Sequence, residues 1–228
     1  MQIEEYYKCI RFTPDPMTYC PKQYIFRKTD MEYEKVNIPL GKSRIGGPVV
    51  DLPIDVQYPE DLFFVAQINL REFKDCFFND YLPKEGFIYV FIGEDGDCGK
   101  VIYSNCKTKD LKRVVKEHGD WFYSGNLIKD IYVEEENISE RYDEEWAKDG
   151  EELGWNPFAG TEKSKLFGIY TNCQYEEQEL KAELLKGKIL LLQIGEDFTE
   201  EGILSVRIDK DDLEKMDFTN CIIEWSQS

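Results

Sequence analysis

The chain has 228 residues, of which 42% are hydrophobic and 14% aromatic, enough to bury the core of one large domain or two small ones. Its 46 acidic and 28 basic residues give a net charge of −18, which argues against unaided binding to nucleic acid or to an anionic membrane. The sequence lacks a membrane-spanning apolar run and a recognisable signal peptide, so we expect a cytoplasmic monomer.

Residues 1–42 are rich in proline and predict an N-terminal arm with one or two short strands, around residues 24–26. Residues 43–106 are β-rich. Apolar runs separated by turn residues predict a strand at 63–68 and a hairpin formed by 87–92 and 101–103.

A helix and an acidic insert are expected between residues 107 and 163. Leu111, Val114, Val115 and His118 follow helical spacing after a candidate N-cap at Thr108, which predicts a helix over 108–118. Residues 130–152 then contain eleven acidic and two basic residues, about half of the net charge.

The acidic insert also contains apolar side chains at helical spacing. Ile138, Tyr142 and Trp146 would share one stripe of a helix over about 139–149, with Ser139 as its N-cap. We therefore expect a docked helix that presents an acidic face.

Residues 164–225 form the second β-rich region. A helix is expected at 176–186, where Gly187 ends it, followed by a buried strand at 188–194. Strict alternation of apolar and polar residues predicts a half-exposed strand at 203–208.

The two β-rich regions share four short motifs in the same order. The matched pairs are residues 43–47 with 164–168, 64–68 with 190–194, 85–88 with 201–204, and 104–106 with 219–221. We interpret them as an internal duplication. The predicted fold is α+β, mostly β, with two related halves packed about a pseudo-twofold axis.

The same motifs resemble a known family. The tract FVAQINL at 64–70, LPKEG at 82–86 and LLLQI at 190–194 followed by EGIL at 201–204 are similar to the YwqG-like family, a duplicated bacterial domain of unassigned function. The second half departs from the family pattern at Gly195, where the family has an acidic residue, and at 198–202.

No catalytic, cofactor or metal site is predicted. Gly41-Lys42-Ser43 lacks the earlier glycine of a phosphate loop, because that position is Val36. His118 is the single histidine, and the seven cysteines contain no Cys-x-x-Cys pair, so we expect free thiols and no zinc. Cys98 lies in an acidic loop that disfavours a reactive thiolate.

Gln67 and Gln193 interrupt apolar strands at equivalent repeat positions. The structural interpretation is that each amide bonds neighbouring backbone and fixes the register where the halves meet. The functional interpretation is that they line a ligand cleft between the halves together with Arg44 and Asn69.

Two functions remain open. The favoured one is a non-enzymatic protein-interaction module, of the immunity type that neutralises a basic toxin, which binds a basic partner through Glu136, Glu140 and Glu144. The alternative is an enzyme or small-ligand binder that uses a cleft between the halves. A filled interface between the halves would favour the first, and a pocket with converging polar groups the second.

Overall fold

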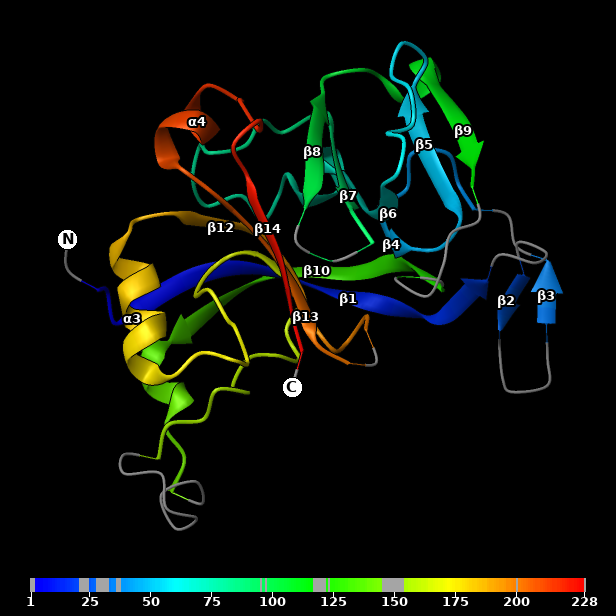
Figure 1. Cartoon of the computed structure of the whole chain (residues 1–228). Helices are drawn as coiled ribbons and strands as arrows, with labels where there is room; N and C mark the ends of the chain where they lie inside the picture. Colours follow the sequence, from blue (N-terminus) through cyan, green and yellow to red (C-terminus); the bar gives the residue numbers. More distant parts are fainter. Residues whose placement is uncertain are drawn as a thin grey trace.

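The computed structural model of the chain describes residues 3–20, 25–27, 33–35, 38–94, 96, 98–116, 122, 124–144, 154–199 and 201–227. These residues form an α+β, mostly β fold, as predicted, built around one sheet of twelve strands (Figure 1). Two long antiparallel strands lie at its centre, β1 (Tyr6–Cys20) and β10 (Gly125–Asn137). Two short strands, β2 (Ile25–Arg27) and β3 (Tyr33–Lys35), extend from β1.

Each central strand carries one half of the remaining sheet. On the β10 side lie β4 (Arg44–Gly46), β6 (Phe63–Asn69), β7 (Phe87–Ile92) and β8 (Gly99–Ser104). On the β1 side lie β11 (Lys165–Phe167), β12 (Ile189–Ile194), β13 (Ile203–Ile208) and β14 (Ile222–Ser226). The strands of the two halves therefore run outwards from the centre in the same order.

Backbone details repeat between the halves as well. Positive φ angles occur at Gly46 and Gly47, 67° and 79°, and at the matching Phe167 and Gly168, 63° and 93°. The Ser43 hydroxyl accepts a hydrogen bond from the Asn69 backbone N–H at 2.8 Å. The matching Ser164 accepts one from the Gly195 N–H at the same distance. This agreement supports related halves, while their origin by duplication and the pseudo-twofold axis stay predictions.

One of the four sequence matches does not correspond in space. Phe87 pairs with Ser104 and Ile203 pairs with Ser226, so Ser226 is the structural counterpart of Ser104. The matched stretch 219–221 instead precedes β14, whereas residues 104–106 end β8 and follow it. The fourth match is therefore wrong, since three small or polar residues recur too easily to mark a position.

The main core lies between the two halves. It contains Ile88 and Val90 of β7 together with Leu204 and Val206 of β13. The two outermost strands, β8 and β14, lie side by side in Figure 1, and the rings of Tyr103 and Phe218 are 6.0 Å apart. The interface between the halves is thus filled by apolar side chains rather than open as a cleft.

The outer faces of the two halves are covered differently. In the first half, β5 (Val49–Pro53) and β9 (Leu111–Val115) form a small sheet over an aromatic cluster. In the second half, α3 (Glu177–Leu185) takes that place, with Leu180 packed on Leu190. Two other short helices are α1 (Leu70–Phe73) and α4 (Lys210–Glu214), and η1 (Thr108–Asp110) and η2 (Ile138–Arg141) are 3-10 helices.

Several predicted elements are confirmed. These are the strand at 63–68, the hairpin of β7 and β8, the helix at 176–186 and the strand at 188–194, each within about two residues of its predicted ends. The strand at 203–208 is also confirmed but is not half-exposed. Ser205 and Arg207 are both buried, and the buried Arg207 guanidinium is paired with Glu183 of α3 and Glu224 of β14.

Three other predictions are wrong, in whole or in part. The expected N-terminal arm is wrong only in part, because the short strand predicted around residues 24–26 is present as β2, but the same segment also contains β1, the central strand. The expected helix over 108–118 is η1 followed by β9, because pairing with β5 satisfies the backbone and suits Val114 and Val115. His118 lies outside the described residues.

The helix expected over 139–149 is also wrong over residues 139–143, while Glu144, the last of its residues that the structure describes, is helical. Residues 130–137 belong to β10, and η2 follows, with the Asn137 side chain accepting from the Ser139 N–H at 2.8 Å. Tyr142 forms a β-bridge with Trp155. Trp146 lies outside the described residues. Within the part of the chain that the structure describes, no helix is long and apolar enough to cross a membrane.

Candidate functional site

The predicted ligand residues of the first half form a buried polar cluster. Gln67, fully buried in β6, donates to the Lys42 carbonyl oxygen at 3.0 Å and accepts from the Asp51 N–H at 2.7 Å. Arg44, also fully buried, forms an ion pair with Asp51. The Asn69 amide donates to a backbone carbonyl at 2.9 Å. These are the backbone contacts expected from the structural interpretation.

Asp51 is the centre of this cluster. Arg113 of β9 binds both of its carboxylate oxygens, from Nε at 2.8 Å and from Nη2 at 3.1 Å, and the Gly41 N–H donates at 2.8 Å. Burial alone would raise the pKa of Asp51. The hydrogen bond from Arg113 and the charge of Arg44 outweigh it and hold this pKa below its ordinary value. Asp51 is therefore a structural anion that ties β5 to β4 and β9.

The second half contains a corresponding cluster. Gln193, fully buried, donates to the carbonyl oxygens of Lys163 at 2.8 Å and Gly160 at 2.9 Å. Lys165, at the repeat position of Arg44, is buried, and its Nζ lies 2.6 and 2.8 Å from the carboxylate oxygens of Glu136. Burial opposes ionisation of Glu136, but the Lys165 charge and hydrogen bonds lower its pKa below the usual value.

The structure brings the four predicted ligand residues into these two clusters and not into a shared cavity. Gln67, Gln193 and Arg44 are completely buried, and their hydrogen bonds and ion pair go to neighbouring protein groups. A ligand would have no access to them through the filled core. Their ligand-binding role stays a prediction that this geometry does not favour.

The three predicted partner residues separate in the structure. Glu136 is only 4% exposed and belongs to the ion pair with Lys165, so it is not available to a partner. The reason is that Glu136 lies on β10, on the strand face that turns inwards, rather than on a helix. Glu140 and Glu144 are exposed.

The start of β1 and the end of β10 lie close to α3 in Figure 1. Several acidic residues of these two chain segments are exposed. The Ile138 N–H bonds the Glu5 carbonyl at 3.1 Å, which holds the two chain segments together. Exposed aromatic side chains lie among the acids, with Tyr6 53% and Tyr142 37% exposed. We name this surface the acidic end and define it by its exposed acids Glu4, Glu5, Glu135, Glu140, Asp143 and Glu144.

A polar cavity of about 330 Å³ lies beside the acidic end, between η2 and residues 156–163. Arg141 forms part of its wall and is only 5% exposed. Sequence reasoning missed Arg141, because this basic residue lies among eleven acidic residues and entered only the net charge of the segment. The one available signal was its place between two predicted core residues, Ile138 and Tyr142.

Among the described residues we find no group of three or more His, Cys, Asp or Glu side chains placed to hold a metal ion. The six cysteines whose side chains are described are free, and Cys98 is exposed. Burial raises the pKa of Cys9 and of Cys221 to about 12, which makes both thiols unreactive at neutral pH.

The chain belongs to the family described as a domain of unknown function, DUF1963, whose model matches residues 43–226. The matched region spans both halves of the sheet and begins at the first repeat motif. The narrower resemblance to the YwqG-like family stays a prediction. A search of curated proteins found no match.

Proposed function

We propose that this domain is a non-enzymatic protein-interaction module whose acidic end binds a basic protein. The observation that carries the proposal is the combination of exposed carboxylates with exposed tyrosines on one surface. Tyrosine supplies contact area at protein interfaces, and clustered charge of one sign selects a partner of the other sign.

The filled core supports a surface function. A ligand cleft on the axis between the halves would need the space that Ile88, Val90, Leu204 and Val206 occupy. The six free cysteines are consistent with a reducing compartment, so we also propose a cytoplasmic location. A monomer remains part of this proposal, since the acidic end would repel a second copy of itself.

The proposal predicts strong dependence on salt. A partner held by charge complementarity loses association rate as ions screen the attraction over a Debye length of about 8 Å at physiological ionic strength. Raising the ionic strength should therefore weaken binding steeply, while an interface held by apolar burial would respond little.

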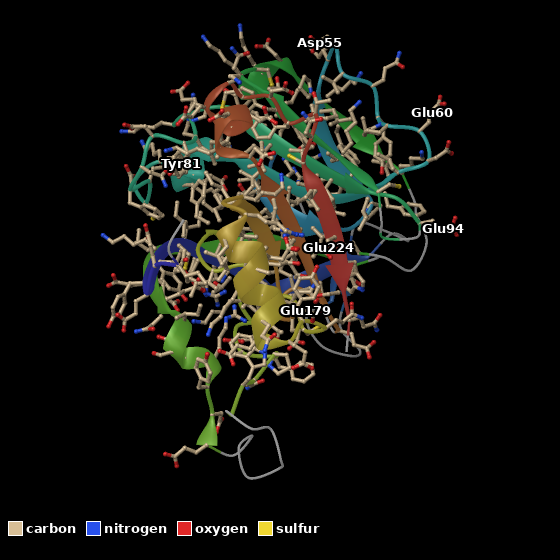
Figure 2. The ribbon with its side chains drawn as sticks, turned by 60° about the vertical axis from the view of Figure 1, so that its left-hand side comes forward. Asp55, Glu60, Tyr81, Glu94, Glu179 and Glu224 are labelled. Carbon is tan, nitrogen blue, oxygen red and sulfur yellow. The ribbon has the colours of Figure 1, made fainter. Side chains whose placement is uncertain are left out.

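The test compares three baits in a lysate pull-down at low and high salt. The first is the wild-type protein, and the second is Glu135→Lys/Glu140→Lys/Glu144→Lys at the acidic end. The third, Asp55→Lys/Glu60→Lys/Glu94→Lys, makes the same charge change at exposed positions elsewhere on the molecule (Figure 2). Glu135 replaces the buried Glu136 of the original prediction.

We expect basic proteins that the wild type and the Asp55/Glu60/Glu94 variant retain at low salt and that the acidic-end variant loses. Melting temperatures of the three proteins should agree, because all six substituted side chains are exposed. A partner retained equally by all three baits, or one that resists high salt, would contradict the proposal.

A further inference from the structure

The cavity beside η2 contains a buried arginine that forms no ion pair with a described residue. Arg141 donates from Nη2 to the Tyr170 carbonyl oxygen at 3.2 Å and to the Thr171 hydroxyl at 2.5 Å, both neutral acceptors. Among the described residues no carboxylate lies within 4.0 Å of its guanidinium. A guanidinium has five N–H donors, so the donors on Nε and Nη1 remain for a ligand.

A buried arginine without a carboxylate is unusual within this chain. In the first half, Arg44 and Arg113 both bind Asp51. In the second half, Glu136 could play that part, but Lys165 and the Ile169 N–H already bind its oxygens. The other buried arginines, Arg11 and Arg207, each have two carboxylates within 4.0 Å. Among the described residues, Arg141 is therefore the buried cation without an ion-pair partner, and the cavity lies beside it.

Arg141 remains charged at neutral pH. Burial lowers its pKa to about 10, although the charges of Glu136, Glu162 and Glu140 act to raise it. Leaving such a charge buried without an ion-pair partner is strongly unfavourable, and an entering carboxylate that accepts a charge-assisted hydrogen bond from Nη1 or Nε would relieve this.

The other charges of the cavity decide what kind of anion fits. Glu140 and Glu162 also line it and are exposed, and neither takes part in an ion pair among the described residues. The remaining cation, Lys163, is already bound to Glu134 at 2.7 Å. A simple dianion such as phosphate would be repelled by the two free carboxylates, whereas a ligand that also carries a positive charge would be attracted.

We propose that this cavity binds a small zwitterion, an amino acid or dipeptide with free termini, whose carboxylate binds Arg141 and whose ammonium group lies near Glu140 and Glu162. A volume of about 330 Å³ is sufficient for such a ligand. Phe158 and Ile169, which also line the cavity, offer apolar contact to its side chain. The Asn137 and Asn156 amides line it too and can donate hydrogen bonds.

The test is calorimetric titration of the full chain with each of the common amino acids and with a set of dipeptides. At least one zwitterion should bind, and its N-acetyl and its amide derivatives should each bind at least about tenfold more weakly, because each removes one charged contact. Equal binding of the derivatives, binding of phosphate or acetate alone, or no binding by any zwitterion would overturn the proposal.

Variants locate the site. Arg141→Gln should abolish binding, and Glu162→Gln should weaken it by about three- to tenfold, since a single exposed charge contributes less. Glu162 is exposed, so its variant keeps the test valid even if Arg141→Gln fails to fold. The matched control is Glu144→Gln, an exposed acid that does not line the cavity, and it should bind as the wild type does. Equal affinity of Glu162→Gln and wild type would place the ligand elsewhere.

This inference does not depend on the proposed function. A basic partner at the acidic end can be absent while a zwitterion still binds at Arg141, and the two experiments use different ligands. The Asp55/Glu60/Glu94 variant also separates them, because it should bind the zwitterion normally.

Discussion

At the level of single residues, the two halves differ in how completely a buried glutamine is hydrogen-bonded. Each buries one glutamine where an apolar strand meets the loop before β4 or β11. The oxygen of Gln67 accepts a hydrogen bond from the Asp51 N–H, but the oxygen of Gln193 has no hydrogen-bond partner among the described residues. A buried polar atom without a partner destabilises the fold relative to a paired one.

The two glutamines should therefore respond differently to replacement by leucine. Gln67→Leu leaves the buried Asp51 N–H without an acceptor and should lower the free energy of unfolding by about 1–3 kcal/mol. Gln193→Leu removes an amide oxygen that already lacks a partner, and it takes a donor only from backbone carbonyl oxygens. The free energy of unfolding should therefore fall less for Gln193→Leu than for Gln67→Leu. Urea denaturation of both variants measures the difference, and a larger loss for Gln193→Leu would contradict this reasoning.

Two buried carboxylates predict a loss of stability in acid. The pKa values of Asp51 and Glu136 are lower in the folded chain than in an unfolded one. The unfolded state then binds more protons between the two values, so the stability they contribute is complete above about pH 4.5 and falls as the pH decreases through the folded values. Burial raises the pKa of Asp197, which contributes in the opposite sense.

Urea unfolding between pH 6 and pH 3 tests this, with Lys165→Met/Glu136→Gln as the comparison. This double variant lacks one of the two low-pKa groups, so its stability should fall less steeply below pH 4.5. An identical pH slope for the wild type and the variant would show that Glu136 is not ionised in the folded state.

Sequence reasoning found part of each buried cluster: Gln67, Arg44 and Asn69 in the first, and Gln193 in the second. Gln67 and Gln193 were recognisable because a polar residue in an apolar strand is conspicuous. Asp51 and Glu136 were not recognised as buried anions, because Asp51 lies in β5, a strand that the sequence analysis did not predict, and Glu136 was expected on an exposed acidic surface. Their burial depends on Arg44 and Lys165, which reach them only after β4 and β11 have paired within the sheet.

At the level of elements, the sequence predicted strands better than helices. Continuous apolar runs such as 87–92 identify buried strands directly. The spacing of Leu111, Val114 and Val115 fits a helix equally well as a strand, and only the partner strand β5 decides between them. β1 was missed because its polar and proline-containing sequence lacks a strand pattern, although its long pairing with β10 stabilises it.

The turn after β11 gives a prediction at this scale. Gly168 has a φ of 93°, and a Cβ there would lie 2.8 Å from the Cβ of Cys9 and overlap the Glu136 carboxylate. Gly160 has a similar φ of 83°, but its Cβ would meet no atom closer than 3.5 Å. An alanine would therefore carry similar backbone strain at Gly168 and at Gly160, and the two positions differ only in the space available for its Cβ.

Gly168→Ala should consequently destabilise the protein by about 1–3 kcal/mol more than Gly160→Ala, which is the usual penalty for overpacking. Thermal and urea denaturation of both variants measure this difference. Equal losses would mean that the Glu136–Lys165 pair moves aside freely and does not fix the turn.

At the scale of the whole molecule, the two halves share their stabilising interactions. The first half joins the sheet through β10 and the second through β1, and the main core takes residues from β7 and β13 alike. Neither half can bury its inner face without the other. The outer faces, covered by β5 and β9 in one half and by α3 in the other, are where the halves differ.

A shared core predicts that the halves unfold together, although the chain is longer than most two-state domains. Hydrogen exchange can test this with Gly168→Ala, which destabilises the second half directly. If opening is global, exchange should accelerate by the same factor in β7 of the first half and in β13 of the second, because the slowest amides of both strands exchange only when the whole core opens. If exchange accelerated in β13 while β7 kept its wild-type protection, the halves would unfold separately. In that case the contacts between Ile88 or Val90 and the strands of the second half would contribute little to the stability of either half.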